Sequence, residues 1–342
     1  MDVQPSVRYF IIDPAGNLSF ASTLRDALAG ADHGGYLWAD YLDPTNESLA
    51  ELATQLKIHP LSLEDCLNEE QLPKLDLFPD YSFMIFNYFE ITTDILAAHE
   101  LDLFLGARFL ITVTRRDSQG RSLLADIHKG IERDNLKIRQ GPSFLMHLII
   151  DNVVDRKFNA LEMLEEKLDE DEDEILNRTG RFDPASLMAT RRQLLVVRKA
   201  VFYEREVLGK LIRMDSPFIA DKSIIYFRDI YDHLSKYYEI SETARDLVTS
   251  LLDIHLSIAS NRMAETANRT NAIMRRLTLI TTIFMPLTLI SGIGGMSEYT
   301  MMIGQENWKW GYVLLLVLMG AIATVNYLFL ARMEKQLPED GN

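Results

Sequence analysis

The chain has 342 residues, 47% of them hydrophobic, and a formal net charge of −15. The length predicts about two domains, and the acidic balance excludes a nucleic-acid-binding protein, because a phosphate backbone attracts Lys and Arg. The single cysteine, Cys66, excludes an internal disulfide and a thiolate zinc site within one chain. Met1–Ala15 lacks the basic and apolar regions of a signal peptide.

The first part of the chain mixes strand-like and helix-like segments. Segments rich in β-branched and aromatic residues predict strands at Val7–Ile12, Ser82–Phe89 and Arg108–Val113. Helical spacing, or a proline at the first helical turn, predicts helices at Pro44–Leu56 and His59–Asn68. We therefore expect an α/β domain over residues 1–140.

Strand signals end near residue 140, and residues 141–276 predict a stalk of long helices. One helix is expected over Phe144–Asn177. A second begins at Asp183, a good N-cap residue that is followed by Pro184 at the first helical position. The acidic run Asp169–Glu174 predicts a solvated face of the first helix.

A long stretch without helix breakers follows. After Asp221 there is no proline until Pro286 and no glycine until Gly292. Because these residues are the usual interruptions of a helix, their absence predicts one continuous helix over Lys222–Ser291. Such a helix is roughly 100 Å long, which is more than a globular domain needs. It is therefore expected to enter a membrane.

Two uncharged runs near the C-terminus are long enough to cross a bilayer, at residues 277–296 and 311–331. Arg275 and Arg276 precede the first run, and Arg332 follows the second. The positive-inside rule therefore predicts a multi-pass protein of the cytoplasmic (inner) membrane with both termini in the cytoplasm. The loop over residues 297–310 then faces outward, and the tail over residues 332–342 faces inward.

One face of the first membrane run is partly polar. Its positions recur every three or four residues, at Asn271, Met274, Thr278, Thr281, Met285, Thr288 and Gly292, with Leu277 beside them. Lipid solvates such a face poorly, so we expect it to face water inside a bundle of several copies of the chain. Two alternatives stay open: the threonines bond back to their own helix, and the methionines pack between helices.

Several segments, in this order along the chain, match one family. They are His59–Asn68 (HPLSLEDCLN), Gln71–Asp76 (QLPKLD), Tyr226–His233 (YFRDIYDH), Asn271–Ser297 (NAIMRRLTLITTIFMPLTLISGIGGMS) and Asn307–Tyr312 (NWKWGY). Together they resemble the CorA family of divalent-cation channels. The resemblance implies an α+β fold class, with an N-terminal α/β domain, a funnel of long stalk helices, two C-terminal membrane helices and a homo-oligomer of five copies.

The resemblance also implies a pore. Its lining positions fall on Asn271, Met274, Leu277, Thr281, Met285 and Thr288. Met274, Leu277 and Met285 would form hydrophobic constrictions that close the pore by excluding water. Asn271 would supply a ring of amide oxygens at the cytoplasmic end.

A second implication is a set of regulatory Mg²⁺ sites between the cytoplasmic domains of neighbouring copies. The matching carboxylates are Glu64, Asp65, Asp155 and Asp229. Bound Mg²⁺ would hold neighbours together and the channel closed, whereas the empty carboxylates would repel one another. Mg²⁺ would then be both substrate and regulatory ligand. The alternative is that these residues are surface carboxylates or helix caps.

The outer mouth departs from the family pattern. The family signature is Gly-Met-Asn, whereas this chain reads Gly295-Met296-Ser297. A serine side chain is shorter than an asparagine side chain and lacks the amide oxygen, so the entrance is expected to be wider. Glu298 and Glu306 in the loop would concentrate cations by their charge.

The favoured function is a divalent-cation channel for Mg²⁺, with Co²⁺ or Ni²⁺ also passing. One alternative is a Zn²⁺ transporter of the related ZntB type, although the seven histidines show no metal-ligand spacing. Another is a non-conducting, Mg²⁺-sensing membrane scaffold. No P-loop, nucleophile elbow or HExxH motif occurs, so no enzyme is predicted. The expected partners are further copies of the chain, the lipid bilayer and divalent cations, and not nucleic acid.

Overall fold

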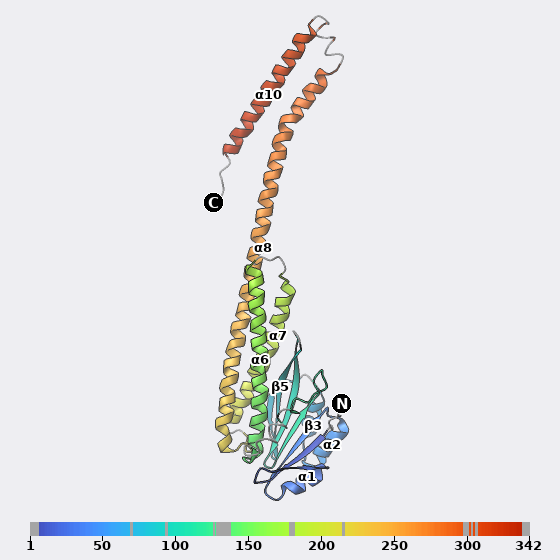
Figure 1. Cartoon of the computed structure of the whole chain (residues 1–342), viewed down its shortest axis with the longest axis vertical. Helices are drawn as coiled ribbons and strands as arrows, with labels where there is room; N and C mark the ends of the chain where they lie inside the picture. Colours follow the sequence, from blue (N-terminus) through green and yellow to red (C-terminus); the bar gives the residue numbers. More distant parts are fainter. Residues whose placement is uncertain are drawn as a thin grey trace. The chain divides into compact units, whose positions relative to one another are not determined.

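A computed structural model of the chain describes residues 7–68, 71–92, 95–125, 127, 138–177, 182–213, 216–296, 301, 304 and 307–336 (Figure 1). The chain divides into two compact units, Met1–Ile254 and His255–Asn342. Helix α8 (Ile224–Gly294) begins in the first unit and ends in the second.

The first unit is built on a mixed sheet of seven strands (Figure 1). In chain order they are β1 (Val7–Ile12), β2 (Leu18–Ala21), β3 (Tyr36–Leu42), β4 (Lys74–Leu77), β5 (Tyr81–Thr92), β6 (Ile95–Gly106) and β7 (Phe109–Thr114). Their spatial order is β2-β1-β3-β7-β6-β5-β4. Among the described strand pairs only β3 and β7 run parallel, with Leu37 opposite Phe109. The other neighbours are antiparallel, and β5 and β6 form a long hairpin.

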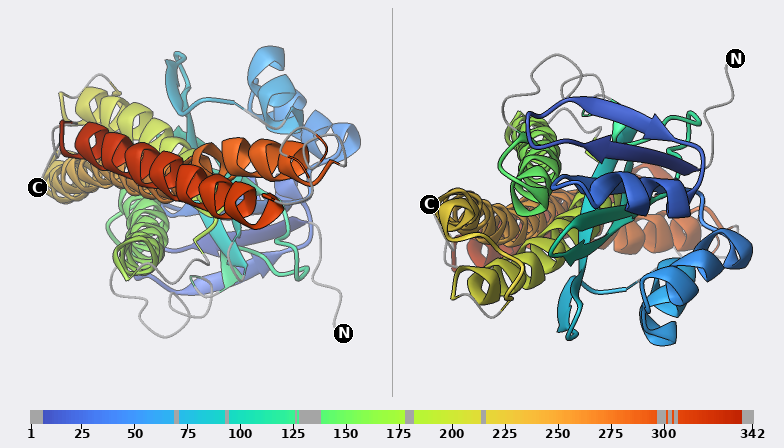
Figure 2. Two further views of the ribbon diagram at one scale, coloured as in Figure 1. Left: turned by 90° about the horizontal axis from the view of Figure 1, so that it is seen from above. Right: turned by 90° about the horizontal axis from the view of Figure 1, so that it is seen from below.

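Three short helices cover one face of the sheet: α1 (Leu24–Ala31), α2 (Asn46–Gln55) and α3 (Pro60–Leu67) (Figure 2). The first begins where Thr23 Oγ1 accepts a hydrogen bond from the Asp26 backbone N–H at 3.1 Å, which satisfies an otherwise unpaired helix donor. Leu24, Leu49 and Cys66, one from each helix, pack with strand residues in one buried core. This core fixes α3 on the sheet.

Two long helices pack against the sheet as well: α6 (Pro142–Leu176) and α7 (Pro184–Ile212). Leu37 and Tyr41 of β3 belong to the core under α1–α3. Because side chains alternate along a strand, Tyr36 points to the opposite side, where its hydroxyl donates to Ile138 O at 2.8 Å, just before α6. The helix α6 therefore lies across the sheet from α3.

A buried ion pair joins α6 to α7. Lys157 Nζ lies 3.2 Å from Glu204 Oε1, and neither side chain is exposed. The Asn87 backbone of β5 bonds to both, because its N–H donates to Glu204 Oε1 at 2.8 Å and its carbonyl accepts from Lys157. Buried charges are tolerated when they are paired and hydrogen-bonded in this way. The contact fixes α6, α7 and β5 relative to one another.

The first part of α8 lies beside α6 and α7. The Tyr226 ring is 5.0 Å from the Phe144 ring and 5.1 Å from the His147 ring of α6, measured between ring centroids. Arg198 of α7 pairs with Glu242 of α8. These contacts make α6, α7 and the start of α8 a three-helix layer.

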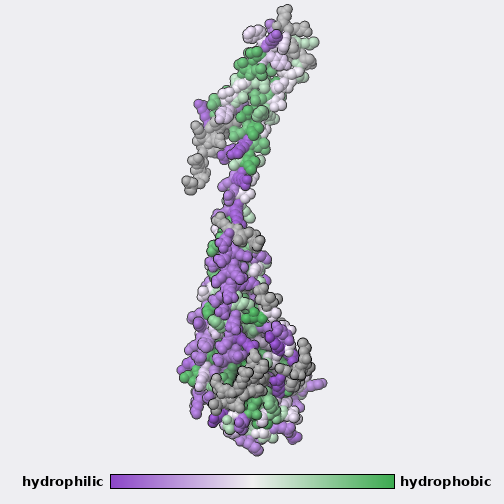
Figure 3. Space-filling model, viewed as in Figure 1, coloured by the Kyte–Doolittle hydropathy of each residue, from purple (hydrophilic) through white to green (hydrophobic). Residues whose placement is uncertain are grey.

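The second unit contains the rest of α8 and helix α10 (Trp308–Gln336). Large apolar side chains such as Ile280, Phe284 and Leu314 are exposed there. Figure 3 shows hydrophobic surface over the upper part of this unit, beyond a hydrophilic stretch of α8. A long helix with apolar side chains all round, few of them buried within the chain, is typical of a membrane-spanning segment.

The longest predicted elements are confirmed. The predicted strand Val7–Ile12 is β1, and the predicted helices Phe144–Asn177 and Lys222–Ser291 are α6 and α8 to within one turn at each end. The helix expected after Asp183 is α7, and the Asp183 side chain caps it by accepting from the Ala185 backbone N–H at 2.9 Å. The sequence did not predict β2, α1, β3, β4 or β6.

Candidate metal-binding residues and membrane helices

Two carboxylates and a histidine meet between α6 and α8. Asp151 and Asp155 lie one helical turn apart on α6, and one ligand atom of each lies within 4.8 Å of the other and of a ring nitrogen of His233 on α8. Asp229, one turn before His233, is close enough for its charge to act on both α6 carboxylates. The predicted ligands Asp155 and Asp229 are thus brought into one neighbourhood.

The electrostatics of this group favour a cation. Partial burial raises the pKa of Asp155, and the Asp151 carboxylate raises it further, while His233 lowers it. Burial also raises the pKa of Asp151, against the influence of His233. A divalent cation would relieve the repulsion between these carboxylates.

The donor set fits two classes of metal. Carboxylate oxygens suit Mg²⁺, whereas an imidazole nitrogen suits Zn²⁺, Co²⁺ or Ni²⁺. His233 Nδ1 is buried and has no hydrogen-bond partner within the described part of the chain. Together, Asp151, Asp155 and His233 offer both kinds of ligand in one place.

The other two predicted ligands, Glu64 and Asp65, lie on α3, across the sheet from α6. Asp65 Oδ2 is 2.7 Å from Lys74 Nζ, so this carboxylate has a cationic partner in its own chain. Glu64 is exposed. The metal-ligand group found among the described residues contains neither of them, so a single chain does not bring them to Asp155.

Sequence reasoning missed Asp151 and His233. A signal was present, because Asp151 and Asp155, like Asp229 and His233, are spaced i and i+4 and so share a helix face. A search for histidines close together in sequence overlooks such a site, since its ligands come from two helices that are far apart along the chain.

The threonines of the α8 stripe bond to their own helix. Thr278, Thr281 and Thr288 each donate the hydroxyl hydrogen to the carbonyl oxygen four residues earlier, at 2.9, 2.8 and 2.8 Å. These hydroxyls therefore bond to their own backbone, as the alternative expects, and the bond is compatible with either surrounding of the stripe. Each hydroxyl oxygen keeps lone pairs that accept, so the bond leaves acceptor oxygens on the outer surface of the helix. A hydrated cation needs such oxygens.

The other stripe positions are exposed as well. Asn271 is exposed, and the exposed fractions of the Met274, Leu277 and Met285 side chains are 57%, 57% and 72%. Large apolar side chains left uncovered over a continuous stripe mark a contact surface for lipid or for another protein. The described residues of a single chain do not complete this stripe into a pathway.

A glycine allows α8 to approach α10 closely. A Cβ atom on Gly294 would lie 2.7 Å from Leu315 Cδ2 of α10, a distance that real Cβ atoms essentially never show. A larger residue at this point would force the Leu315 side chain to move, and small residues commonly allow membrane helices to pack this closely.

The predicted mouth is described only in part. Gly295 and Met296 directly follow α8 and are exposed, and the Gly295 N–H donates to Ser291 O at 3.0 Å, as in a last helical turn. Ser297, Glu298 and Glu306 lie outside the described residues.

Two described helices are long and apolar enough to cross a bilayer. They are the segment Asp221–Gly294, which contains α8, and Trp308–Phe329 in α10. Almost none of their most apolar stretches is buried in the chain, which distinguishes them from the core helices of a soluble domain. Residues 277–294 of the first predicted membrane run and 311–329 of the second fall within these segments.

Known proteins resemble this chain over most of its length. The family model described as CorA-like Mg²⁺ transporter protein matches residues 33–332. The cobalt/magnesium transport protein CorA of Thermotoga maritima is 34% identical over 281 residues, which are 80% of this chain and 75% of that protein. The zinc transport protein ZntB of Yersinia pseudotuberculosis is 22% identical over 305 residues, which are 87% of this chain and 86% of that protein.

A solved structure agrees at the level of the fold. The CorA magnesium transporter of Methanocaldococcus jannaschii has a TM-score of 0.69 and 24% sequence identity, with 96% of this chain and 98% of that chain covered. The family match, the two candidate membrane spans and the mixed sheet agree with this similarity of fold. The chain belongs to the CorA family of divalent metal ion transporters.

Proposed function

We propose that this protein is a channel for Mg²⁺ in the cytoplasmic membrane, formed by five copies of the chain with both termini in the cytoplasm. The observation that carries the proposal is the oxygen-bearing stripe of α8. Thr278, Thr281 and Thr288 present acceptor oxygens on the exposed side of an otherwise apolar helix. Several copies arranged around an axis would turn this stripe into a wet pathway and leave α10 facing lipid.

The proposed pathway alternates polar and apolar rings. Asn271, Thr281 and Thr288 would supply oxygens to a hydrated ion, and Met274, Leu277 and Met285 would form rings that close by excluding water. At the outer end, Gly295, Met296 and Ser297 would form the mouth, with Glu298 and Glu306 attracting cations.

Regulation would depend on a site shared between copies. Glu64 and Asp65 lie across the sheet from Asp155 within one chain, so they reach a metal at the α6–α8 group only from a neighbouring copy. Mg²⁺ bound there would hold two copies together and favour the closed state, provided that it binds the closed state more tightly. Asp151 and His233 join the predicted ligands in this proposal, since they lie beside Asp155.

Zn²⁺ transport is the second candidate. It is favoured by the His233 imidazole in the metal-ligand group and by the name of the ZntB relative. The membrane runs contain no Asp, Glu, His, Lys or Arg that could couple transport to protons near neutral pH, so we propose a passive channel as the first candidate.

Flux into proteoliposomes tests the proposal. Mg²⁺, Co²⁺, Ni²⁺ and Zn²⁺ uptake would be compared with and without a pH gradient. A passive Mg²⁺ channel takes up Mg²⁺ without the gradient. Uptake of Zn²⁺ alone, increased by a pH gradient, would establish the second candidate. Uptake of no ion by a correctly assembled oligomer would instead indicate a non-conducting, metal-sensing scaffold.

The mouth is tested by Ser297→Asn, which restores the amide oxygen of the family signature. If the mouth selects ions through such oxygens, this variant raises Mg²⁺ flux several-fold. Flux unchanged from the wild type would remove Ser297 from the selective mouth.

A further inference from the structure

A cavity of about 350 Å³ opens between the sheet and α7 in the first unit. Its walls come from the segment before β4, from β5 and β6, from the residue after β7 and from α7. The side chains that matter for its chemistry are Asn87, His99, Glu100, Arg115 and Lys199. None of the proposed pore or metal-binding residues lines it, so transport leaves this cavity unexplained.

The floor of the cavity is held by the buried ion pair. The backbone N–H and carbonyl of Asn87 bond to Glu204 and Lys157. Both charged side chains are fully buried. Because the Asn87 backbone is fixed from below, its side-chain amide is held in the cavity wall and offers one donor group and one acceptor.

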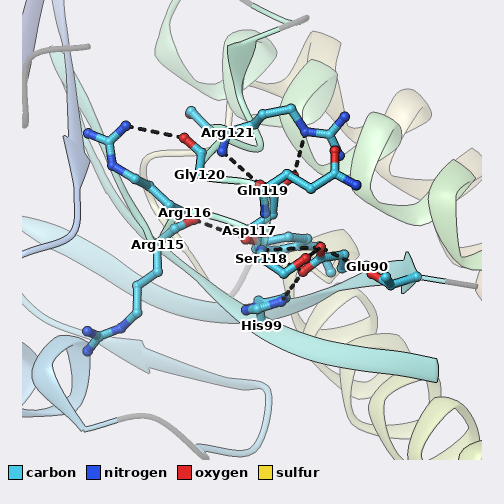
Figure 4. Close-up of polar contacts among 12 residues, drawn as sticks. Glu90, His99, Arg115, Arg116, Asp117, Ser118, Gln119, Gly120 and Arg121 are labelled. Atoms are coloured by element: carbon cyan, nitrogen blue, oxygen red, sulfur yellow. Dashed lines mark hydrogen bonds and ion pairs between the residues drawn. The ribbon is translucent and has the colours of Figure 1, made fainter. Parts of the chain in front are cut away.

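A second network holds His99 in place (Figure 4). His99 Nε2 lies 3.0 Å from Glu90 Oε2, and the imidazole stacks on the Tyr88 ring with centroids 5.0 Å apart. Glu90 also accepts from the Ser118 backbone N–H, at 3.2 Å to Oε1 and 3.1 Å to Oε2. Burial and these bonds make this wall rigid before any ligand arrives, which favours binding.

Two cations face the same cavity. The Arg115 guanidinium donates to Leu67 O at 3.0 Å, and Figure 4 shows its side chain leaving the loop on the side opposite Arg116. Lys199 is exposed on α7 and forms no ion pair within the described part of the chain. The wall also contains the Glu100 carboxylate, which accepts from the Gln71 backbone N–H. In a chain of net charge −15, a cavity lined by two cations and one such carboxylate favours an anionic ligand. Arg and Lys together are the usual partners of phosphate.

We propose that this cavity binds a nucleoside monophosphate. Arg115 and Lys199 would hold the phosphate. Asn87 and Glu100 would bond to the ribose hydroxyls or to the edge of the base, and apolar residues of the wall such as Leu72 and Val196 would contact its face. The volume is within the range of small-molecule sites. The site is separate from the residues proposed for metal transport. A nucleotide bound there would contact both α7 and the sheet, so its concentration in the cytoplasm would affect how firmly the two are held together.

Isothermal titration of AMP into the full-length protein, purified in detergent with EDTA, tests this. Without divalent cations the nucleotide cannot bind through the metal-ligand residues. We expect saturable binding that Lys199→Glu weakens by about tenfold or more, roughly 1.4 kcal/mol. Lys210→Glu is the matched control, because it reverses an exposed charge three turns further along α7. AMP affinity should be unchanged in this variant.

A second variant tests whether AMP needs the volume of the cavity. Ala98 is exposed in the cavity wall, so Ala98→Leu fills space without disturbing the core, and it should abolish AMP binding. The proposal is overturned if AMP does not bind saturably, if inorganic phosphate binds equally well, or if Lys210→Glu weakens binding as much as Lys199→Glu. Because no flux is measured, failure of the channel proposal would leave this result standing.

Discussion

The two units of this chain differ in where they leave side chains that are costly in their surroundings: the first buries polar groups in pairs, and the second exposes apolar groups. In the first unit, several charges and hydroxyls that leave water have partners in the same chain, as Lys157 has Glu204 and as Ser82 has Ser216 at 2.8 Å. In the second unit, Met285 and Leu314 stay exposed. The contrast indicates that the core of the first unit is formed within one chain, whereas the apolar side chains of the second are left for surroundings other than water.

The largest loss of stability is expected from breaking the buried ion pair of the first unit. Lys157→Met would leave the Glu204 carboxylate buried without its cation, and losing one partner of a buried pair costs about 3–5 kcal/mol. Glu204 Oε2 has no hydrogen-bond partner among the described residues, and the neutral Asn87 N–H at Oε1 cannot replace the charge of the ammonium. Thermal unfolding of the full-length protein in detergent should show a midpoint many degrees lower.

The double variant Lys157→Met with Glu204→Leu provides the control. It removes both charges and fills the space with apolar groups, so most of the lost stability should return. A single variant as stable as the wild type would mean that water reaches Glu204, and the first unit would then be less complete than its contacts indicate.

A smaller change in stability is expected when the pH is varied. Asp102 on β6 is buried, and Oδ1 has no hydrogen-bond partner in the described part of the chain. Burial, and then the charge of Glu100, raises the pKa of Asp102 from 3.8 to about 8. Between these two values the folded protein keeps a proton that the unfolded chain releases. Stability therefore falls as pH rises through this window, by about 1.4 kcal/mol per pH unit at most.

Asp102→Asn keeps the shape of the side chain and removes this titration. We expect the unfolding midpoint of the wild type to decrease relative to that of the variant between pH 5 and pH 7.5. Other groups titrate equally in both proteins and cancel in the difference. Parallel profiles would show that Asp102 is ionised in the folded protein.

Much of the fold was readable from the sequence because long elements carry strong signals. The gap without Pro or Gly before Pro286 predicted α8, and Asp183-Pro184 predicted the start of α7. The missed elements lack such signals. The helix α1 is short, and β6 carries His99, Glu100 and Asp102 on a strand whose pairing with β5 and β7 decides its conformation. Tertiary pairing of this kind is not visible in a local pattern.

The candidate site was readable in part for the same reason. The stripe of α8 follows helical periodicity within one element, so its positions were predicted together. The metal-ligand group was not, since Asp151 and His233 meet only through the packing of α6 on α8. The Arg115–Lys199 cavity likewise depends on the contact of the sheet with α7.

The second unit offers a matched pair of threonines. Thr281 on α8 and Thr324 on α10 are both exposed, and both donate to the carbonyl four residues earlier, at 2.8 Å. Replacing either by Val removes the same hydroxyl and the same backbone bond. If the α8 stripe lines the pathway, Thr281→Val should reduce Mg²⁺ flux by about tenfold, equal to ~1.4 kcal/mol in the barrier. Thr324→Val should leave flux near the wild-type value, and equal losses would indicate a role in helix stability.

The smallest effect is expected from replacing His233, whose imidazole should matter for the binding of Co²⁺ and Zn²⁺ but not for that of Mg²⁺. His233→Gln removes an imidazole nitrogen, which Co²⁺ and Zn²⁺ favour and Mg²⁺ does not need. Inhibition of flux by internal Co²⁺ should weaken about fivefold, roughly 1 kcal/mol, while inhibition by Mg²⁺ stays near the wild-type value. Asp173→Asn, an exposed change elsewhere on α6, should alter neither. Equal weakening for both ions would mean that His233 only packs on Tyr237, 6.3 Å away between ring centroids, and that the carboxylates alone hold the metal.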